Sequence, residues 1–197
     1  MPRWLRPLQN GQALSAGRLR AGALTEVTVR DDDEFVAFVE QSGRRLCDTA
    51  FWLCGDWSLA QDLTQTTFIK VYLSWRRIRR HDPYPYSKQV LLRTYLDHKR
   101  LKSSTEVQTD EIPDAVLDRP TVADTVELRI TLLEALGRLS PPDRAIIVLR
   151  YWEDHSVQTV AELLGLSTGT VKTRSMRALA RLRLLLGEDE PVPVPPA

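Results

Sequence analysis

A short segment near the C-terminus combines small hydroxyl residues with basic residues in an order that suits a polyanion. Ser167, Thr168 and Thr170 lie where the pattern starts a helix, so that free N–H groups and the helix dipole favour a phosphate there. Thr173 and Arg177 lie one turn apart on its polar face, and arginine favours O6 and N7 of guanine. Three further basic residues could hold the phosphate backbone: Lys172, Arg174 and Arg181. The segment is therefore a candidate DNA-binding helix.

The residues before this helix predict how it is presented. A short helix that begins at Ser156 ends at Gly165, because glycine adopts the left-handed conformation at little cost. Leu166 then fills the corner, and Ser167 or Thr168 caps the next helix. The apolar side of that helix consists of Val171, Ala178, Leu179 and Leu182. This order predicts a helix-turn-helix, the alternative being an ordinary surface helix with a solvated polar face.

The charge of the chain is unevenly distributed. The net charge is only +1, which at first argues against a nucleic-acid partner. Basic residues nevertheless dominate residues 76–102 and 168–183, while acidic residues dominate the segment between them, residues 106–127. Two basic modules with an acidic spacer predict two separate contacts with a polyanion.

The first basic module lies within a predicted helical domain that covers residues 31–102. Its apolar periodicity follows Asp31–Asp33, which suit an N-cap and a first turn. A second helix is predicted to open at Ser58, with Gln61 completing a capping box, and a third runs from about Tyr86 to Leu101. The prolines just before this third helix predict an ordered turn.

The rest of the chain divides at changes of composition. Residues 1–30 show no sustained period and are predicted to be flexible, and the acidic, proline-interrupted residues 103–124 are predicted to be a linker. Ser140, followed by two prolines and an acid, starts a helix of a second domain, residues 125–187. Residues 188–197 are a Pro-rich tail that is predicted to be disordered. The predicted fold class is therefore all-α: two small helical domains joined by a flexible acidic linker, with a C-terminal helix-turn-helix.

Other chemistry finds little support in the sequence. Cys47 and Cys54 share a helix face at a spacing too long for an easy disulfide, so we expect buried, reduced cysteines. The histidines are isolated (His81, His98 and His155), and no nucleophile–base pair or metal-ligand spacing can be assembled, so we expect neither an enzyme nor a cofactor or metal. No run approaches the ~20 apolar residues of a membrane helix, and no signal peptide is evident. We therefore expect a cytoplasmic protein without membrane insertion.

The order of these motifs resembles the extracytoplasmic-function sigma factors of RNA polymerase over about residues 33–186. The run Asp62-Leu63-Thr64-Gln65-Thr66-Thr67-Phe68 is similar to the Asp-Leu-x-Gln-x-x-Phe motif of the family's sigma-2 domain. Asp143–Trp152 and Gly169–Arg174 are similar to its sigma-4 domain. The resemblance implies a sigma factor that binds core RNA polymerase, directs promoter-specific initiation through the minus-35 and minus-10 elements, and helps to melt the DNA.

The resemblance also implies contacts for individual residues. Contacts with core polymerase, on the beta-prime clamp, fall to Asp62, Leu63, Gln65, Thr66 and Phe68. Contacts with the minus-10 element, including a flipped base, fall to His81, Tyr84, Tyr86, Lys88, Gln89, Arg93, Lys99 and Arg100. Contacts with the minus-35 element fall to Ser167, Thr168, Thr170, Lys172, Thr173, Arg174, Arg177 and Arg181.

The implied partners are core polymerase (through the beta-prime clamp and the beta flap), promoter DNA and an anti-sigma factor. The linker of about 22 residues can stretch to about 70 Å. Promoter elements 16 to 18 base pairs apart are separated by about 55 to 60 Å of duplex. The linker can therefore span them. The alternative is a homodimeric helix-turn-helix transcription regulator that acts without polymerase, but the basic, aromatic helix in residues 31–101 is unusual for a sensor domain.

Overall fold

The structure is a computed structural model that describes residues 21–105 and 123–187, and side chains are described for residues 32–102 and 128–187. The described chain is helical and contains no strand, which confirms the predicted all-α class. The N-terminal half, residues 21–105, contains α1 (Ala21–Cys54), α2 (Trp57–Leu73), α3 (Trp75–Ile78) and α4 (Pro83–Thr105). The C-terminal half, residues 123–187, contains α5 (Ala123–Gly137), α6 (Pro141–Ile147), the π-helical turn η2 (Val148–Trp152), α7 (Val157–Leu164) and α8 (Thr168–Leu186).

The core of the N-terminal half lies where α1, α2 and α4 pack against one another. Leu46, Phe51, Val71, Leu91 and Tyr95 are each at most 1% exposed. Removing such large apolar surfaces from water is the main contribution that holds three amphipathic helices together. The arrangement also fixes which faces of α2 and α4 remain at the surface.

The start of α1 differs from the prediction. The helix begins at Ala21 instead of near Asp31, so it includes residues 21–30 of the segment that the sequence assigned to a flexible extension. Two acids near the predicted start make tertiary contacts: Asp32 accepts a hydrogen bond from Tyr72 Oη at 2.7 Å, and Glu34 pairs with Arg79 at 2.7 Å. Acidic residues at this point therefore hold α1 against α2 and the turn after α3.

Two further boundaries need correction. The N-cap of α2 is Asp56, whose side chain accepts from Leu59 N at 3.0 Å, so the capping box at Ser58 is wrong. The helix α4 begins at Pro83 instead of Tyr86, because prolines fit the first turn of a helix, where no intrahelical donor is needed. The same helix continues to Thr105, into the predicted linker. The remaining predictions for residues 1–20, 106–122 and 188–197 lie outside the described chain.

The C-terminal half follows the local signals closely. Ser140, Ser156 and Ser167 each cap a helix by accepting from the backbone N–H three residues on. Gly165 ends α7 at φ 66°, the left-handed conformation expected of it. Val160, Val171 and Leu182 are buried between α7, α8 and their neighbours. The predicted helix-turn-helix is therefore present as α7 and α8.

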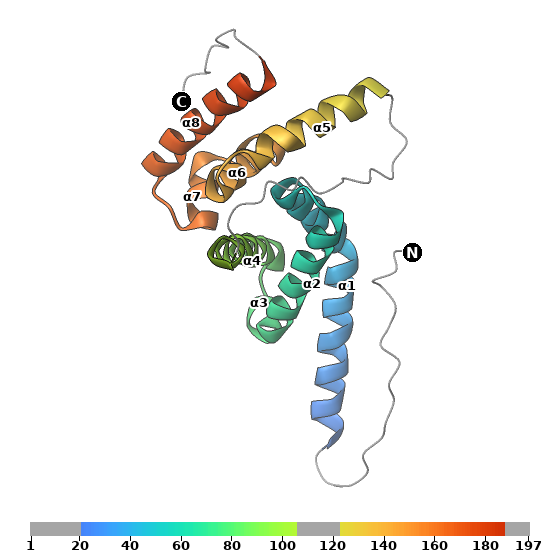
Figure 1. Cartoon of the computed structure of the whole chain (residues 1–197). Coiled ribbons are helices and arrows are strands. Elements are labelled where there is room, and N and C mark those ends of the chain that lie inside the picture. The colour runs from blue at the N-terminus through green and yellow to red at the C-terminus, as the bar shows by residue number, and fades with distance from the viewer. Residues whose placement is uncertain (1–20, 106–122, 188–197) are drawn as a thin grey trace.

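The two halves lie side by side and form one continuous core (Figure 1). The helix α4 contacts α6 and α7, and α1 contacts α6 and η2. The Trp52 and Trp152 rings meet with centroids 4.1 Å apart, and Arg144 Nε donates to the backbone oxygen of Trp52 at 3.0 Å. The surface that α4 presents is therefore partly covered by the C-terminal half.

Candidate nucleic-acid interface

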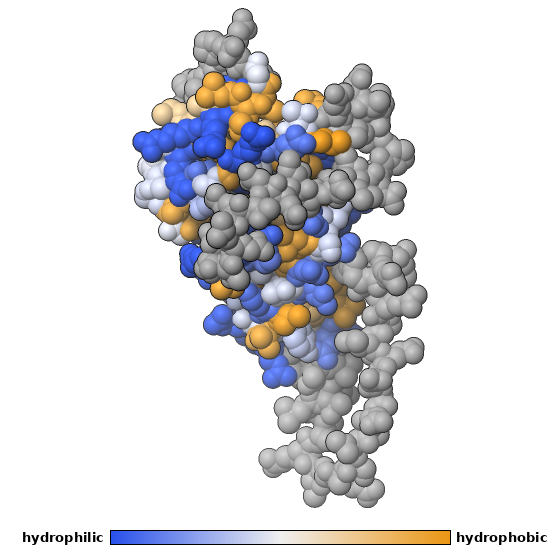
Figure 2. Space-filling model, viewed as in Figure 1, coloured by the Kyte–Doolittle hydropathy of each residue, from blue (hydrophilic) through white to orange (hydrophobic). Residues whose placement is uncertain are grey.

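The helix α8 presents its polar face to solvent. Val171, Ala178 and Leu182 are buried on one side, which leaves the opposite side free. The exposed predicted minus-35 residues are Ser167, Thr168, Lys172, Thr173, Arg177 and Arg181, while Thr170 is half-buried. Hydrophilic residues gather over this part of the molecule in Figure 2. The face carries several cations within reach of a single groove of duplex DNA.

The hydroxyls at the start of α8 are already engaged. Ser167 Oγ accepts from Thr170 N at 3.1 Å and lies 2.8 Å from Thr170 Oγ1. Thr173 Oγ1 donates to Gly169 O at 3.0 Å. These contacts hold the first turn in shape, so Ser167 and Thr170 contribute chiefly by fixing the helix end.

Arg174 has a structural contact that the sequence did not indicate. Its Nε donates to Asp143 Oδ1 at 2.7 Å, at the start of α6. Burial raises the pKa of the Asp143 carboxyl, but hydrogen bonds from Arg174 and Ser140 outweigh it and hold that pKa below its usual value. Because this ion pair joins α8 to α6, Arg174 positions the recognition helix, and its Nε is not free for a phosphate.

One residue of the α8 face was missed. Met176 is 62% exposed and lies three residues after Thr173 and next to Arg177. An exposed, unbranched thioether can contact the methyl group of thymine in the major groove. Helical spacing alone places Met176 off the apolar face formed by Val171 and Ala178, so the sequence pattern contained the signal.

The predicted minus-10 residues fall into three groups on and before α4. His81, Arg93 and Arg100 are exposed, whereas Tyr84, Tyr86, Gln89 and Lys99 are half-buried. The Tyr86 hydroxyl donates to Ser74 Oγ at 3.2 Å, which ties α4 to the end of α2. Burial lowers the pKa of Lys99, and the positive charge of Arg144 lowers it further. Lys88 differs from all of these, because it is buried.

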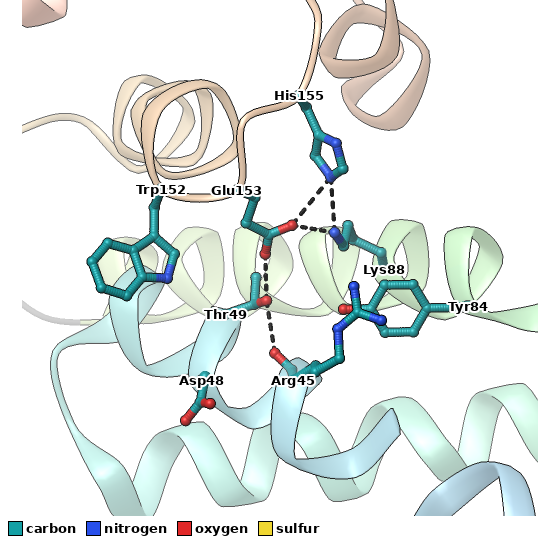
Figure 3. Close-up of a pocket in the computed structure, with 8 residues that line it drawn as sticks. All are labelled: Arg45, Asp48, Thr49, Tyr84, Lys88, Trp152, Glu153 and His155. Atoms are coloured by element: carbon teal, nitrogen blue, oxygen red, sulfur yellow. Dashed lines mark hydrogen bonds and ion pairs between the residues drawn. The ribbon is translucent and has the colours of Figure 1, made fainter. Parts of the chain in front are cut away.

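Lys88 lies in a cluster between the halves (Figure 3). Its Nζ pairs with the Glu153 carboxylate and lies 2.8 Å from His155 Nε2. The same carboxylate also accepts a hydrogen bond from Thr49 Oγ1. The Lys88 and Glu153 side chains are only 5% and 12% exposed. Together with Arg45, Asp48, Tyr84 and Trp152, these residues line a cavity of about 240 Å³. In this arrangement Lys88 contacts protein and is not open to DNA.

Two cations face the Tyr84 ring in the same cluster. Arg45 Cζ and Lys88 Nζ lie 4.3 Å and 5.0 Å from the ring centroid. Burial raises the pKa of Tyr84, and the Glu153 charge acts in the same direction. The combination of an aromatic ring and two cations is one that suits a nucleic-acid strand.

The predicted polymerase-binding residues of α2 divide between surface and core. Asp62, Gln65 and Thr66 are exposed, but Leu63 and Phe68 are 3% and 8% exposed and belong to the core. Leu63 and Phe68 therefore support the helix and offer no contact surface. Three apolar residues that the prediction omitted continue the exposed face along α2: Ile69, Tyr72 and Leu73. Ile69 lies three and four residues after Thr66 and Gln65, and Tyr72 and Leu73 lie three and four residues after Ile69, so these residues share one face.

Other chemical features are few within the described residues. Cys47 and Cys54 are buried and free, which confirms their prediction, and burial raises the pKa of Cys54 to about 11. The described part of the chain contains no group of histidine, cysteine and acidic side chains arranged to hold a metal ion. In the same residues, no helix has both the length and the apolar content needed to cross a membrane.

Comparisons with known proteins place this architecture. The sequence-family model for sigma-70 region 2 matches residues 38–105, and the one for sigma-70 region 4 matches residues 129–182. The RNA polymerase sigma-E factor of Streptomyces avermitilis is 36% identical over 151 residues, which cover 76% of this chain and 83% of that protein. The RNA polymerase sigma factor SigV of Bacillus subtilis is 31% identical over 134 residues, which cover 66% of this chain and 78% of that protein.

Solved structures agree on the fold. The structure of CnrH in complex with the cytosolic domain of CnrY matches with a TM-score of 0.55 and 25% identity, covering 79% of this chain and 89% of that one. The sigma factor RpoE, in complex with the anti-sigma factor NepR from Bartonella quintana, matches with a TM-score of 0.60 and 22% identity, covering 79% of this chain and 98% of that one. The chain therefore belongs to the extracytoplasmic-function sigma factors of the sigma-70 family.

Proposed function

We propose that this sigma factor binds core RNA polymerase through the exposed face of α2, the minus-10 element through α4 and the minus-35 element through α8. The family directs promoter-specific transcription and consists of regulatory proteins, not catalysts. The observation that carries the assignment is that one chain holds an exposed basic recognition helix, α8, and a separate basic and aromatic helix, α4. A homodimeric regulator would need only the first of these.

The proposed polymerase surface consists of Asp62, Gln65 and Thr66, extended by the apolar Ile69, Tyr72 and Leu73. Leu73 is 81% exposed and Ile69 is 58% exposed, and together with the exposed Tyr72 they form one apolar patch on α2. Apolar side chains beside an acid and an amide suit a helical protein partner. The beta-prime clamp is the partner that the family resemblance implies.

The proposed division of DNA contacts follows from exposure. Thr173, Met176 and Arg177 lie together on the outward face of α8 and are assigned to base edges. Lys172 and Arg181 are assigned to phosphates, where they contribute affinity without sequence preference. On α4, the exposed Arg93 and Arg100 are assigned to the DNA of the minus-10 region.

An anti-sigma factor is a further proposed partner. The RpoE structure is a complex with an anti-sigma factor, and this chain shares its fold. We expect such a protein to cover the exposed α2 face and the surface of residues 146–152. In that second stretch Ile146 and Ile147 are buried, so Tyr151 and Trp152, which are 53% and 55% exposed, would carry the contact.

Run-off transcription with core polymerase tests the proposal. The purified chain should direct initiation from specific start sites on a genomic library and bind the same promoters poorly without polymerase. Replacing Asp62 and Gln65 together by Ala should weaken holoenzyme assembly without changing helix content. Replacing Gln158 and Glu162 by Ala is a matched control, because it removes an exposed amide and acid from α7 instead. Equal affinity of both double variants for core polymerase would refute the α2 assignment.

A further inference from the structure

We infer that Thr49, Lys88 and Arg45 form a binding site for a backbone phosphate of promoter DNA, and that Glu153 occupies this site when the two halves are closed. The closed arrangement and DNA binding then exclude each other through one anion site. The inference rests on the proposed function of α4.

The contacts of Glu153 are those of a bound oxyanion. Its carboxylate receives Lys88 Nζ on one oxygen and Thr49 Oγ1 on the other, and His155 Nε2 lies 3.1 Å from the first oxygen. A carboxylate and a phosphate both present oxygens that accept charge-assisted hydrogen bonds. The donors Thr49 and Lys88, from α1 and α4, belong to the N-terminal half, whereas Glu153 and His155 come from the loop after η2. The donors therefore remain together when Glu153 leaves.

The site has a stable form without Glu153. Thr49 Oγ1 also lies 2.9 Å from Arg45 O, its own helix backbone, so its hydroxyl has an alternative acceptor. Lys88 and Arg45 stay beside the Tyr84 ring. The one acid that lines the cavity in this half is Asp48, whose carboxylate is 3.9 Å from Arg44 Nε. Two cations thus face the cavity against one partly compensated acid, which favours an anion from outside.

The position of the site selects a nucleic-acid phosphate over other anions. Lys88 and Tyr84 lie in the first two turns of α4, next to the exposed His81 and in the segment assigned to an unstacked promoter base. A strand whose base stacks near Tyr84 carries its phosphates within a few ångströms of that ring. The donors therefore lie where a backbone phosphate of the same strand would pass.

Closure is incompatible with a bound promoter on geometric grounds as well. In the closed chain α4 contacts α7, the first helix of the helix-turn-helix. The two promoter elements lie about 55 to 60 Å apart on duplex DNA. The halves must therefore separate before both elements can be bound at once, and this separation withdraws Glu153 from Lys88.

One buried residue in the contact between the halves, Arg144, destabilises the closed state. Arg144 is 5% exposed, and its Nη2 is buried with no hydrogen-bond partner among the described residues. Burial lowers the pKa of Arg144, and the charge of Arg144 in turn helps to lower the pKa of Lys99. A buried, incompletely paired guanidinium destabilises the closed state. The Glu153 contact and the tilted Trp52–Trp152 ring contact oppose this contribution, so the closed state is held by a balance of the two.

The test separates an anion site from a simple interdomain contact. Glu153→Gln and Lys88→Gln break the same ion pair, and Glu134→Gln, an exposed acid on α5, is the matched control. Small-angle X-ray scattering of the full chain should give a larger radius of gyration for the first two variants and an unchanged one for Glu134→Gln. Fluorescence anisotropy measures binding of a fluorescein-labelled, random-sequence single-stranded DNA. Its length of about 15 nucleotides is enough to cover a typical single-strand-binding site.

Only Glu153→Gln should bind this DNA more tightly, by on the order of tenfold, because charged hydrogen bonds of this kind have that magnitude. The slope of log affinity against log salt should become steeper by about one, as one phosphate contact is added. Adding Thr49→Val or Lys88→Gln to Glu153→Gln should reverse part of the gain. Equal gains for Glu153→Gln and Lys88→Gln would overturn the phosphate site, and an unchanged radius for both would overturn the closure.

Separate measurements test whether free phosphate is the ligand and whether the proposed function is correct. Inorganic phosphate should displace the labelled DNA from Glu153→Gln no better than chloride at equal ionic strength, and stronger displacement would overturn the assignment to DNA. These measurements need no polymerase. If run-off transcription fails while the Glu153→Gln gain is present, the proposed function is wrong and the anion site stands.

Discussion

Replacing Gly55 by Ala tests whether the two halves contact each other in solution as the structure describes. Gly55 ends α1 at φ 79°, where an L-amino acid with a side chain costs about 1–2 kcal/mol. A Cβ atom there would lie 3.3 Å from Arg144 Nη2, which belongs to the other half. The guanidinium would have to move by a few tenths of an ångström, away from the site where Nε donates to Trp52 O at 3.0 Å.

The expected magnitude has two parts. Backbone strain alone contributes about 1–2 kcal/mol. Loss of the charged hydrogen bond to Trp52 O adds up to about 1.5–3 kcal/mol. Gly165→Ala is the matched control, because Gly165 ends α7 at φ 66° and a Cβ there would meet no atom of the described residues within 4 Å. We expect Gly55→Ala to be more destabilising than Gly165→Ala by about 1 kcal/mol or more.

The assay is urea denaturation of the full chain followed by far-UV circular dichroism. A double-mutant cycle with Arg144→Met isolates the contact, since the extra cost of Gly55→Ala should disappear when the guanidinium is absent. If Gly55→Ala and Gly165→Ala cost the same in the wild-type background, Arg144 does not lie against Gly55 in solution. The reasoning about the closed arrangement would then be refuted.

Other expected outcomes concern readout, reactivity and pH. Arg177→Ala should cost about 1–3 kcal/mol at one base position of the minus-35 element, whereas Lys172→Ala should weaken all promoters alike, as binding to a panel of promoter variants would reveal. Cys54 should react very slowly with a thiol reagent at neutral pH and rapidly after denaturation, because burial raises its pKa to about 11 and only the thiolate is nucleophilic. Burial lowers the pKa of His155, and the positive charge of Lys88 lowers it further. The negative charges of Glu153 and Asp154 raise it by less than this. The closed state therefore favours neutral His155, and its stability should be fully present above about pH 6.5 and decline as the pH falls through that value. Scattering across this range should show the chain opening at low pH, and His155→Asn should suppress the response more than His98→Asn, whose pKa is also lowered.

Local signals in the sequence predicted the C-terminal half well. A serine cap, a glycine C-cap and an apolar corner depend only on residues a few positions apart, so Ser140, Ser156 and Gly165 could be assigned directly. The same logic failed at α2, where Asp56 and Ser58 are both good N-cap residues. Because α1 ends at Cys54 and Gly55 makes the turn, the structure uses the earlier candidate.

The start of α1 could not be found by propensity. Residues Val27, Thr28 and Val29 are β-branched and weaken a helix prediction, and Asp31–Asp33 resembles a helix start. The structure uses Asp32 and Glu34 to bind Tyr72 and Arg79 instead. Tertiary contacts of this kind override local preference, and no sequence pattern announces them.

The same limit applies to the site. Exposure of Lys172 and Arg177 followed from helical spacing, but the burial of Lys88 depends on Glu153, which is 65 residues away in the chain. Arg174 likewise finds Asp143 at a separation of 31 residues. A basic residue on a predicted polar face can therefore bind protein instead of DNA, and only the tertiary structure distinguishes the two.

The π-helical turn of residues 148–152 determines where the side chains that follow α6 point. Such a turn holds about one residue more than an α-helical turn, and each residue of an α-helix advances the chain by about 100°. Trp152 is the last residue of this turn, and Glu153 follows it directly. Because the wider turn accommodates the extra residue, rewinding all five residues as an α-helix would leave α6 intact and rotate both side chains by roughly that angle away from Trp52 and Lys88. Deleting one residue as well would restore their direction. The wide turn directs Trp152 and Glu153 toward the N-terminal half, so the closure that we infer depends on the backbone geometry of one turn as well as on the side chains at the contact.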